Sequence, residues 1–283
     1  MRRSLLAAIP IAILYTIQPL TAQDGPPPPD PSIRYQSVPI EGVGSVTALR
    51  KALGADAFSL VLKINRLDLE HVRQGDSLMV PEGVSEPLSY SPFPRSLPRE
   101  LSPSPRLLVV SRRVQAFAAY EHGVLVRWGP TSTGRKETQT PAGLYHANWR
   151  AKLRRSSDND QWLLPWLVNF ENQRGISFHQ FDLPGYPASH ACVRLLEADA
   201  RWIFGWVEQW VLSEDRRSVV VHGTPVVVFG EYAYDATPPW KRLVEDPVAA
   251  TVGGPELESA LEPHAALIAE RARLREEFLS GKS

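Results

Sequence analysis

Two residue types that can perform nucleophilic catalysis lie close together in the stretch from Ile176 to Leu195. Cys192 is the only cysteine of the chain, and His179 and His190 precede it in a segment rich in turn residues. A cysteine reacts as its thiolate, so it needs a proton acceptor or a positive neighbour to lower its pKa from about 8.5. We predict that Cys192 is a nucleophile and that His179 is the base that activates it.

Length and composition fit a folded protein of one large or two modest domains. The 283 residues include 43% apolar residues and eight tryptophans, enough for a substantial core. The formal charge is zero, from 31 basic and 31 acidic residues, and no dense basic run follows the first three positions. We therefore expect neither nucleic acid nor an anionic membrane surface as a partner.

The first 22 residues have the pattern of an export signal. Arg2 and Arg3 are followed by an apolar stretch from Leu5 to Leu20, and Thr21-Ala22 offers small residues for cleavage. The apolar stretch is shorter than the roughly 20 residues that span a bilayer, which favours a cleaved signal over an uncleaved anchor. We expect an exported protein of the periplasm or cell wall. A lone cysteine there is either buried and inert or a reactive thiol, and its neighbours favour the reactive thiol.

A proline-rich spacer at residues 23–37 precedes a small folded unit, which we assign to residues 38–82. Val46–Leu53 and Ala57–Ile64 have helical periodicity, and a Gly75-Asp76 turn leads into a terminal strand. The pattern predicts a compact α/β module.

This module resembles a LysM domain, a small module that binds cell-wall sugars. The resemblance rests on the KINRLD run that begins at Lys63 and the QGDSLMVP run that begins at Gln74. The strand and glycine-aspartate-threonine turn that open the family are replaced by EGVGS at Glu41 to Ser45. The module is therefore either a working glycan binder or a degenerate unit that only packs.

A second, larger domain is assigned to residues 106–230, after a proline-rich linker or strap at residues 83–105. An amphipathic helix is predicted from Glu197 to Val211, directly after Cys192, where its N-terminus would favour a thiolate. The other elements read as short strands in successive hairpins, which predicts a mainly β, antiparallel fold. These strands are expected at Arg106–Ser111, Val114–Tyr120, Val124–Trp128, Gly143–Trp149, Trp162–Phe170, Gly175–Phe178 and Ser218–Phe229.

The larger domain resembles the YkuD-type catalytic domain of L,D-transpeptidases. The family signature is a histidine, a variable loop, and then serine, any residue, glycine, cysteine, any residue and arginine or asparagine. Here it reads as His179, the loop from Phe181 to Ala188, and SHACVR from Ser189 to Arg194. Ala191 replaces the usual glycine, at a cost of about 1 kcal/mol if φ is positive there. Matching pieces in the same order are Ser132-Thr133-Gly134, Thr140-Pro141-Ala142-Gly143 and Gly223-Thr224-Pro225-Val226.

The resemblance implies a β-sandwich enzyme that acts on peptidoglycan stem peptides without a metal or cofactor. Cys192 would attack the L,D bond before a terminal D-alanine and form a thioester, with His179 as base and acid. Backbone N–H groups at Ala191 and Cys192 would stabilise the oxyanion. A second stem peptide would then make a 3,3 cross-link, whereas water would make the enzyme an L,D-carboxypeptidase. A silenced thiol would leave a wall-binding protein.

Ser189, His190, Ala191 and Arg194 are assigned to the oxyanion and substrate site, with support of the loop as the alternative for Ser189, His190 and Arg194. In some members the residue after the histidine orients the imidazole. That residue is Gln180, which could act through its side-chain amide or its backbone carbonyl.

Three alternatives concern neighbouring residues and other classes of site. Trp162 and Trp166 either line the cleft or pack in the core. A metal site made of His179, His190 and Cys192 has no fourth ligand at a recognisable spacing. Papain-like and NlpC-type hydrolases place the cysteine before the histidine in the chain, which is the reverse of the order here.

The C-terminal extension, residues 231–283, leaves the catalytic pattern. A turn-rich segment from Glu231 is expected to lie across the domain. Glu262 to Leu279 predicts a charged terminal helix, with Pro263 near its start and Gly281 just past its end. This helix is either solvated or binds a partner.

Overall fold

The computed structural model of the chain describes residues 33–83, 86–156 and 159–281. The predicted export signal and most of the predicted spacer lie outside these residues. Within the described residues, the helices are too short or too polar to cross a membrane.

Residues 35–81 form a strand–helix–helix–strand arrangement, which we call the βααβ unit. Its elements are β1 (Tyr35–Pro39), α1 (Val43–Leu53), α2 (Ala55–Asn65), a short 3-10 turn η1 (Leu69–His71) and β2 (Ser77–Pro81). The helices and the terminal strand match the sequence prediction. Residues 35–37 do not belong to the spacer, because β1 pairs antiparallel with β2. The unit has its own small core, which includes Ile40, Val61, Leu67, Leu78 and Val80.

A single nine-stranded sheet forms the larger domain, in the order β6-β13-β3-β4-β5-β10-β9-β8-β7. This confirms the mainly β fold. Two of the pairings, β13 with β3 and β10 with β9, are parallel, and the others are antiparallel. The strands are β3 (Arg106–Ser111), β4 (Ala116–Glu121), β5 (Val124–Ser132), β6 (Gly143–His146), β7 (Arg150–Arg155), β8 (Leu163–Glu171), β9 (Ile176–Gln180), β10 (Val193–Leu195) and β13 (Pro225–Phe229).

The sheet curls until its two ends meet. The amide of Asn148 donates to the carbonyl of Asn169 at 2.7 Å, and the amide of Asn169 donates to the carbonyl of Trp149 at 2.9 Å. These bonds join the segment after β6, at one end of the sheet, to β8 near the other end. The curl encloses an inner core and leaves an outer face to be covered by other elements.

Strand β3 is buried on both faces of the curled sheet. Leu108 and Val110 point into the inner core, whereas Leu107 and Val109 belong to a second cluster on the outer face. A strand that is buried on both sides needs apolar residues at every position, which explains the uninterrupted run LLVV.

Helix α3 (Glu197–Trp206) packs into the inner core through Ala200 and Ile203. It ends at Trp206 and not at Val211, because Val207 is extended and Val211 begins β11 (Val211–Leu212), which pairs with β12 (Val219–Val221). It also does not follow Cys192 directly, because β10 lies between them. The N-terminus of α3 is therefore one strand away from the sulfur.

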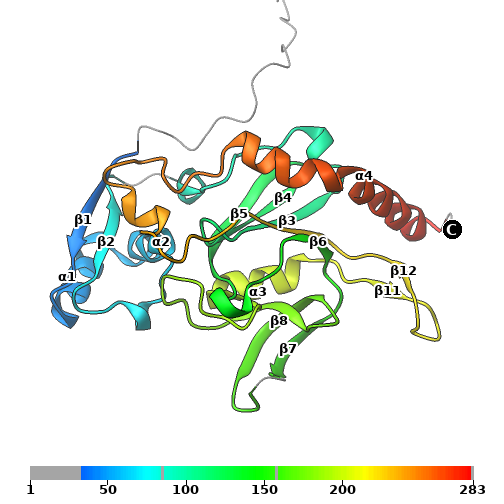
Figure 1. Cartoon of the computed structure of the whole chain (residues 1–283), viewed down its shortest axis with the longest axis horizontal. Helices are drawn as coiled ribbons and strands as arrows, with labels where there is room; N and C mark the ends of the chain where they lie inside the picture. Colours follow the sequence, from blue (N-terminus) through cyan, green and yellow to red (C-terminus); the bar gives the residue numbers. More distant parts are fainter. Residues whose placement is uncertain (1–32, 84–85, 157–158, 282–283) are drawn as a thin grey trace, which may run out of the picture.

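Helix α4 (Gly254–Leu279) runs along the outer face of the sheet (Figure 1). It begins at Gly254 and not at Glu262, with Pro263 inside it, and it buries Leu257, Leu261 and Ile268. Its first half is therefore packed against the domain. The segment before β3 buries Phe93 and Leu97 in the same cluster, so its described part is a strap over the outer face.

The βααβ unit is joined to the larger domain by a mixed interface at one end of the molecule (Figure 1). Arg66, only 3% exposed, donates from Nε to the carbonyl of Val114 at 2.8 Å. Its guanidinium also lies 5.2 Å from the ring of Trp240. Lys63 of α2 forms an ion pair of 3.3 Å with the buried Asp199 of α3. These contacts fix the unit on the domain.

Candidate active site

The predicted base lies on β9, and the predicted nucleophile directly precedes the adjacent strand β10. The parallel ladder pairs His179 of β9 with Arg194 of β10. Phe178 and Val193 point into the inner core, so His179 and Arg194 share the opposite face. Cys192 comes two residues before Arg194. Cys192 therefore stands directly before β10, at the start of the strand that pairs with the strand of His179.

The imidazole of His179 is oriented by the backbone. His179 is 4% exposed, and its Nδ1 lies 3.1 Å from the carbonyl oxygen of Gln180. Because a carbonyl can only accept, Nδ1 carries the proton and Nε2 keeps a lone pair. Of the two possibilities for Gln180, the structure therefore has the backbone carbonyl.

The electrostatic surroundings keep His179 neutral. Burial lowers the pKa of His179 to about 4, and the positive charge of Arg194 acts in the same direction, although the bond to Gln180 opposes the shift. The value is well below the 6.5 of an unperturbed imidazole. At neutral pH the ring is therefore a neutral base with Nε2 as its acceptor.

Cys192 is partly buried and forms no disulfide. Its Sγ lies 3.9 Å from the carbonyl oxygen of Gly175, in the turn between β8 and β9. Arg194 interacts electrostatically with Cys192, and its guanidinium lies 4.6 Å from the ring of Phe181. A fixed cation near a thiol favours the thiolate. Arg194 can therefore act on the sulfur as well as on the loop.

Ser189 holds the turn that contains the thiol. It is 2% exposed, its hydroxyl donates to the carbonyl of Cys192, and the same oxygen accepts the amide of Ala191 at 3.2 Å. Of the two amides assigned to the oxyanion, that of Ala191 is thus already engaged within the turn. These bonds of Ser189 lie within the turn and favour the supporting role over substrate binding.

Ala191 adopts the backbone conformation in which glycine is favoured. Its φ is 97°, in the left-handed region, and the residue is 3% exposed. Its carbonyl accepts a hydrogen bond of 2.7 Å from the hydroxyl of Thr140. The departure from the family signature therefore falls at a position where a Cβ is costly.

The two tryptophans have different surroundings. Trp162 lies 5.3 Å from the ring of His190 and 6.1 Å from that of Phe181, so it covers the motif loop. Trp166 packs instead against Phe204 of α3 at 5.5 Å. Of the two, only Trp162 contacts the loop between His179 and Cys192, beside the exposed His190.

Three residues that hold the motif loop were not singled out by the sequence reasoning. Ser132 donates to the carbonyl of Tyr186 at 2.8 Å and accepts the amide of Ala188 at 3.0 Å. Thr140 holds Ala191, and Asp68 of the βααβ unit accepts the amide of Leu183 at 2.7 Å. All three belong to runs that the sequence analysis quotes, Asp68 as the last residue of KINRLD, and these runs could have pointed to them.

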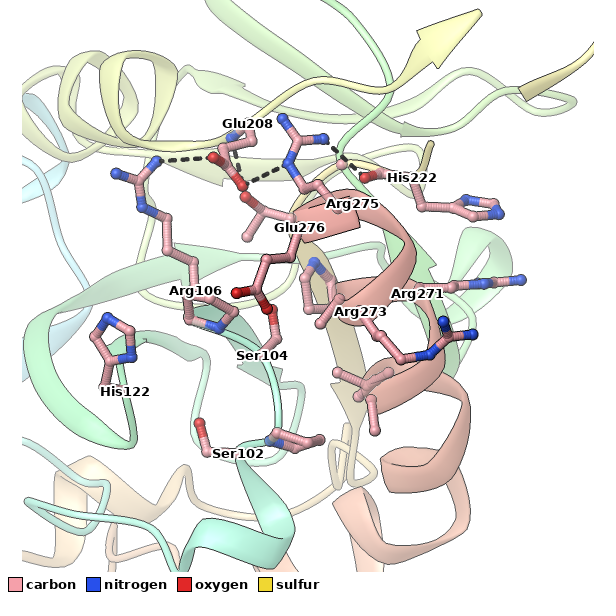
Figure 2. A pocket seen from close by; sticks show the side chains of 18 of the residues that line it. Ser102, Ser104, Arg106, His122, Glu208, His222, Arg271, Arg273, Arg275 and Glu276 are labelled. Atoms are coloured by element: carbon pink, nitrogen blue, oxygen red, sulfur yellow. Dashed lines mark hydrogen bonds and ion pairs between the residues drawn. The ribbon is translucent and has the colours of Figure 1, made fainter. Parts of the chain in front are cut away.

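A large open cavity of about 1150 Å³ lies elsewhere, between α4 and the strap, and its lining does not include Cys192 or His179. Figure 2 shows Arg106 and Arg275 directed at Glu208. Nη1 of Arg106 lies 4.0 Å from one carboxylate oxygen of Glu208, and Nε of Arg275 lies 2.9 Å from the other. Arg275 also donates to the carbonyl of His222 at 2.9 Å. Arg275 therefore ties the end of α4 to the domain. No group of three or more histidine, cysteine, aspartate or glutamate side chains suited to a metal occurs in the described part of the chain.

Residues 105–228 match the family model of the YkuD L,D-transpeptidase catalytic domain. The match covers less than half of the chain, and it shows that the chain carries a catalytic domain of this type. The search of curated proteins gives no match.

Similar solved structures include three L,D-transpeptidases. The L,D-transpeptidase 1 of Mycobacterium tuberculosis is 24% identical, with a TM-score of 0.33, over 44% of this chain and 62% of that one. The enzyme of Mycobacterium smegmatis is 19% identical, with a TM-score of 0.35, over 45% and 59%. The enzyme of Xylanimonas cellulosilytica is 22% identical, with a TM-score of 0.43, over 69% and 98%. The chain thus spans less than two thirds of the mycobacterial proteins.

Proposed function

We propose that this chain, through its YkuD-type catalytic domain, is an exported peptidoglycan L,D-transpeptidase that forms 3,3 cross-links between stem peptides. The observation that carries the proposal is the arrangement of His179 and Cys192. His179 lies on β9, and Cys192 directly precedes the strand that pairs with it. The Nδ1 of His179 donates to a backbone carbonyl, so that Nε2 remains as a proton acceptor. This arrangement occurs inside the segment that matches the family.

In the first half of the reaction, Cys192 attacks the carbonyl of the L,D bond before the terminal D-alanine of a tetrapeptide stem. The thiol proton passes to Nε2 of His179 as the carbon–sulfur bond forms. The carbon–nitrogen bond then breaks, and the same proton passes to the departing D-alanine amine. A thioester between the stem peptide and Cys192 remains.

In the second half, the side-chain amine of another stem peptide attacks the thioester. The amine loses a proton to His179, the new amide bond forms, and the sulfur leaves and recovers the proton. Because burial lowers its pKa, His179 starts each half as a neutral base and holds the proton only briefly. Arg194 supports the sulfur whenever it carries negative charge.

The alternative is a catalytically silent wall-binding protein, and one observation favours it. Ala191 has a φ of 97° where the family signature has glycine, so the turn before the thiol is strained. An L,D-carboxypeptidase would use the same first half and water in the second.

The test is intact-mass spectrometry of the protein from Gln23 onward, with a carbapenem and separately with a disaccharide-tetrapeptide. A transpeptidase forms an adduct that depends on Cys192, loses D-alanine from the muropeptide and yields a cross-linked dimer. A tripeptide product would indicate the carboxypeptidase. The Cys192→Ala variant is the control, and a folded wild-type protein that forms no adduct with either compound would reject the enzymatic function.

A further inference from the structure

We propose that Asp68 of the βααβ unit is a positioning residue for the active-site loop between His179 and Cys192. The unit would then be a structural part of the active site and not only a module carried beside it. The inference rests on the proposed function for its kinetic measurement, but its structural measurement is independent of that function.

Asp68 forms hydrogen bonds to the loop through both its backbone and its side chain. Its amide donates to the carbonyl of Leu183 at 3.0 Å, and its Oδ2 accepts the amide of Leu183 at 2.7 Å. The neighbouring residues Leu67 and Pro184 form an antiparallel bridge. Leu183 is completely buried. The βααβ unit and the loop therefore meet as two short extended segments, and a carboxylate supplies the strongest of the bonds.

The carboxylate of Asp68 is itself held in place. Its Oδ1 accepts the amide of His71 at 2.9 Å and lies 2.7 Å from Nδ1 of the same histidine. Asp68 thus caps η1 with one oxygen and binds the loop with the other. A side chain with both oxygens engaged has little freedom, which is what a positioning role requires.

The βααβ unit provides a rigid base for this contact. Arg66, two residues before Asp68, is buried and bonded to the carbonyl of Val114. Lys63 is paired with the buried Asp199. On the loop side, Gly185 has a φ of 86°, and a Cβ there would lie 3.1 Å from the side chain of Leu67. The two surfaces are thus closely fitted beside Asp68.

The loop is held from two sides, and Asp68 holds the side next to the base. The larger domain holds the later part of the loop, where the amide of Ser189 donates to the carbonyl of Thr133 at 3.1 Å. Asp68 holds Leu183, four residues after His179. Between them lies Phe181, whose ring is 5.9 Å from that of His179 and 4.6 Å from the guanidinium of Arg194.

A second link runs along the surface in the same direction. The Nε2 of His71 lies 4.0 Å from the carboxylate of Asp182, and Asp182 interacts electrostatically with Arg194. Loss of the Asp68 carboxylate would release His71 and the amide of Leu183 together, while the backbone bond to the Leu183 carbonyl would remain. The expected consequence is a displacement of Phe181 and Asp182, and with them of Arg194 and the imidazole that activates Cys192.

The test compares Asp68→Ala with Asp68→Asn in the full chain, beside Asp76→Ala. Asp76 is a matched control, because its Oδ2 accepts the amide of Arg73 at 2.6 Å in the same unit, as a local cap that leaves the loop untouched. We measure hydrogen exchange of the Leu183 amide, the rate constant of Cys192 acylation at saturating carbapenem, and Tm. Asp76→Ala loses one local bond, so its Tm should fall by about 2–4 °C. Asp68→Ala loses the bond to Leu183 as well as a cap, so its Tm should fall further.

Asp68→Ala should speed exchange at Leu183 and slow acylation by about tenfold with a small change in the half-saturating concentration. Asp68→Asn keeps one acceptor oxygen and should therefore recover part of the protection of the Leu183 amide and part of the acylation rate. The proposal is overturned if Asp68→Ala acylates at the wild-type rate, or if Asp76→Ala is slowed equally. If the wild type forms no adduct, the proposed function fails. The positioning role is then decided by two other measurements, the hydrogen exchange of the Leu183 amide and the rate of Cys192 alkylation by iodoacetamide. If both are unchanged in Asp68→Ala, the positioning role is overturned.

Discussion

The hydroxyl of Thr140 donates a 2.7 Å hydrogen bond to the carbonyl of Ala191, and its oxygen accepts the amide of Gly134 at 2.9 Å. Thr140 is completely buried. The residue before Cys192 is thus held at a φ of 97° by a fixed partner. A conformation that alanine disfavours persists where the surroundings determine it this firmly.

Replacing Ala191 with glycine should relieve this strain. A glycine has no Cβ to penalise a positive φ, which removes about 1–2 kcal/mol of strain, and the greater freedom of glycine in the unfolded chain offsets part of it. The free energy of unfolding, measured by urea denaturation, should therefore rise by up to about 1 kcal/mol. Acylation of Cys192 by a carbapenem should be as fast as in the wild type or faster.

The control for this change is Ala188→Gly in the same loop, since Ala188 is not among the residues with positive φ. Glycine there only adds freedom to the unfolded chain and should lower the stability, by up to about 1 kcal/mol. Equal loss of stability in both variants would show that the conformation of Ala191 is not strained.

The variant Thr140→Val tests the hydrogen bond from Thr140 to the carbonyl of Ala191. Valine has nearly the same shape, but it leaves the Gly134 amide and the Ala191 carbonyl buried without this partner, which should cost about 2–4 kcal/mol. Cys192 acylation should slow, because the turn is free to move. Thr47→Val, which removes an exposed bond of 3.1 Å to the Val43 carbonyl in α1, should change stability by less than about 0.5 kcal/mol. A similar small loss in Thr140→Val would contradict the role of Thr140.

Most strands of the larger domain could be predicted because buried strands are rich in apolar residues. β3 is apolar at successive positions since both of its faces are covered. β7 was missed because Arg150–Arg155 is a charged, exposed edge strand, and edge strands avoid the apolar pattern that reveals central ones. The predicted end of α3 was wrong for a different reason. The apolar spacing continues to Val211, but Val211 pairs with β12, which the sequence spacing does not show.

The candidate catalytic residues could be predicted from their order in the motif, but their supports could not. The orienting group of His179 is a backbone carbonyl, which every residue type offers, so its identity is not encoded in Gln180. Asp68 lies 115 residues before Leu183 in the chain, and a contact at that separation exists only once the βααβ unit has docked. The LysM resemblance of this unit stays a prediction.

Gln180→Ala should leave the enzyme nearly unchanged. The carbonyl that accepts from His179 Nδ1 belongs to the backbone at this position, and alanine retains it. We expect the rate of Cys192 acylation to stay within about twofold of the wild type. His179→Ala is the comparison and should abolish acylation at neutral pH. A loss of more than about tenfold in Gln180→Ala would mean that the side-chain amide orients the imidazole instead.

The stability and the activity of the protein should both report the lowered pKa of His179, which burial shifts to about 4. In the unfolded chain the imidazole titrates near 6.5, so the unfolded state takes up a proton first as the pH falls. The stability linked to the neutral imidazole is present above pH 6.5 and is lost between pH 6.5 and 4, by about 3 kcal/mol in total. His146, whose pKa burial lowers to about 3, adds a similar loss of stability.

The variant His179→Gln retains His146. The difference in unfolding free energy between this variant and the wild type, followed by urea denaturation across this pH range, therefore isolates His179. The acid limb of Cys192 acylation should likewise fall near pH 4 in the wild type. Parallel stability curves for the two proteins, with an acid limb near pH 6.5, would mean that the imidazole is solvated and that its burial does not set the chemistry.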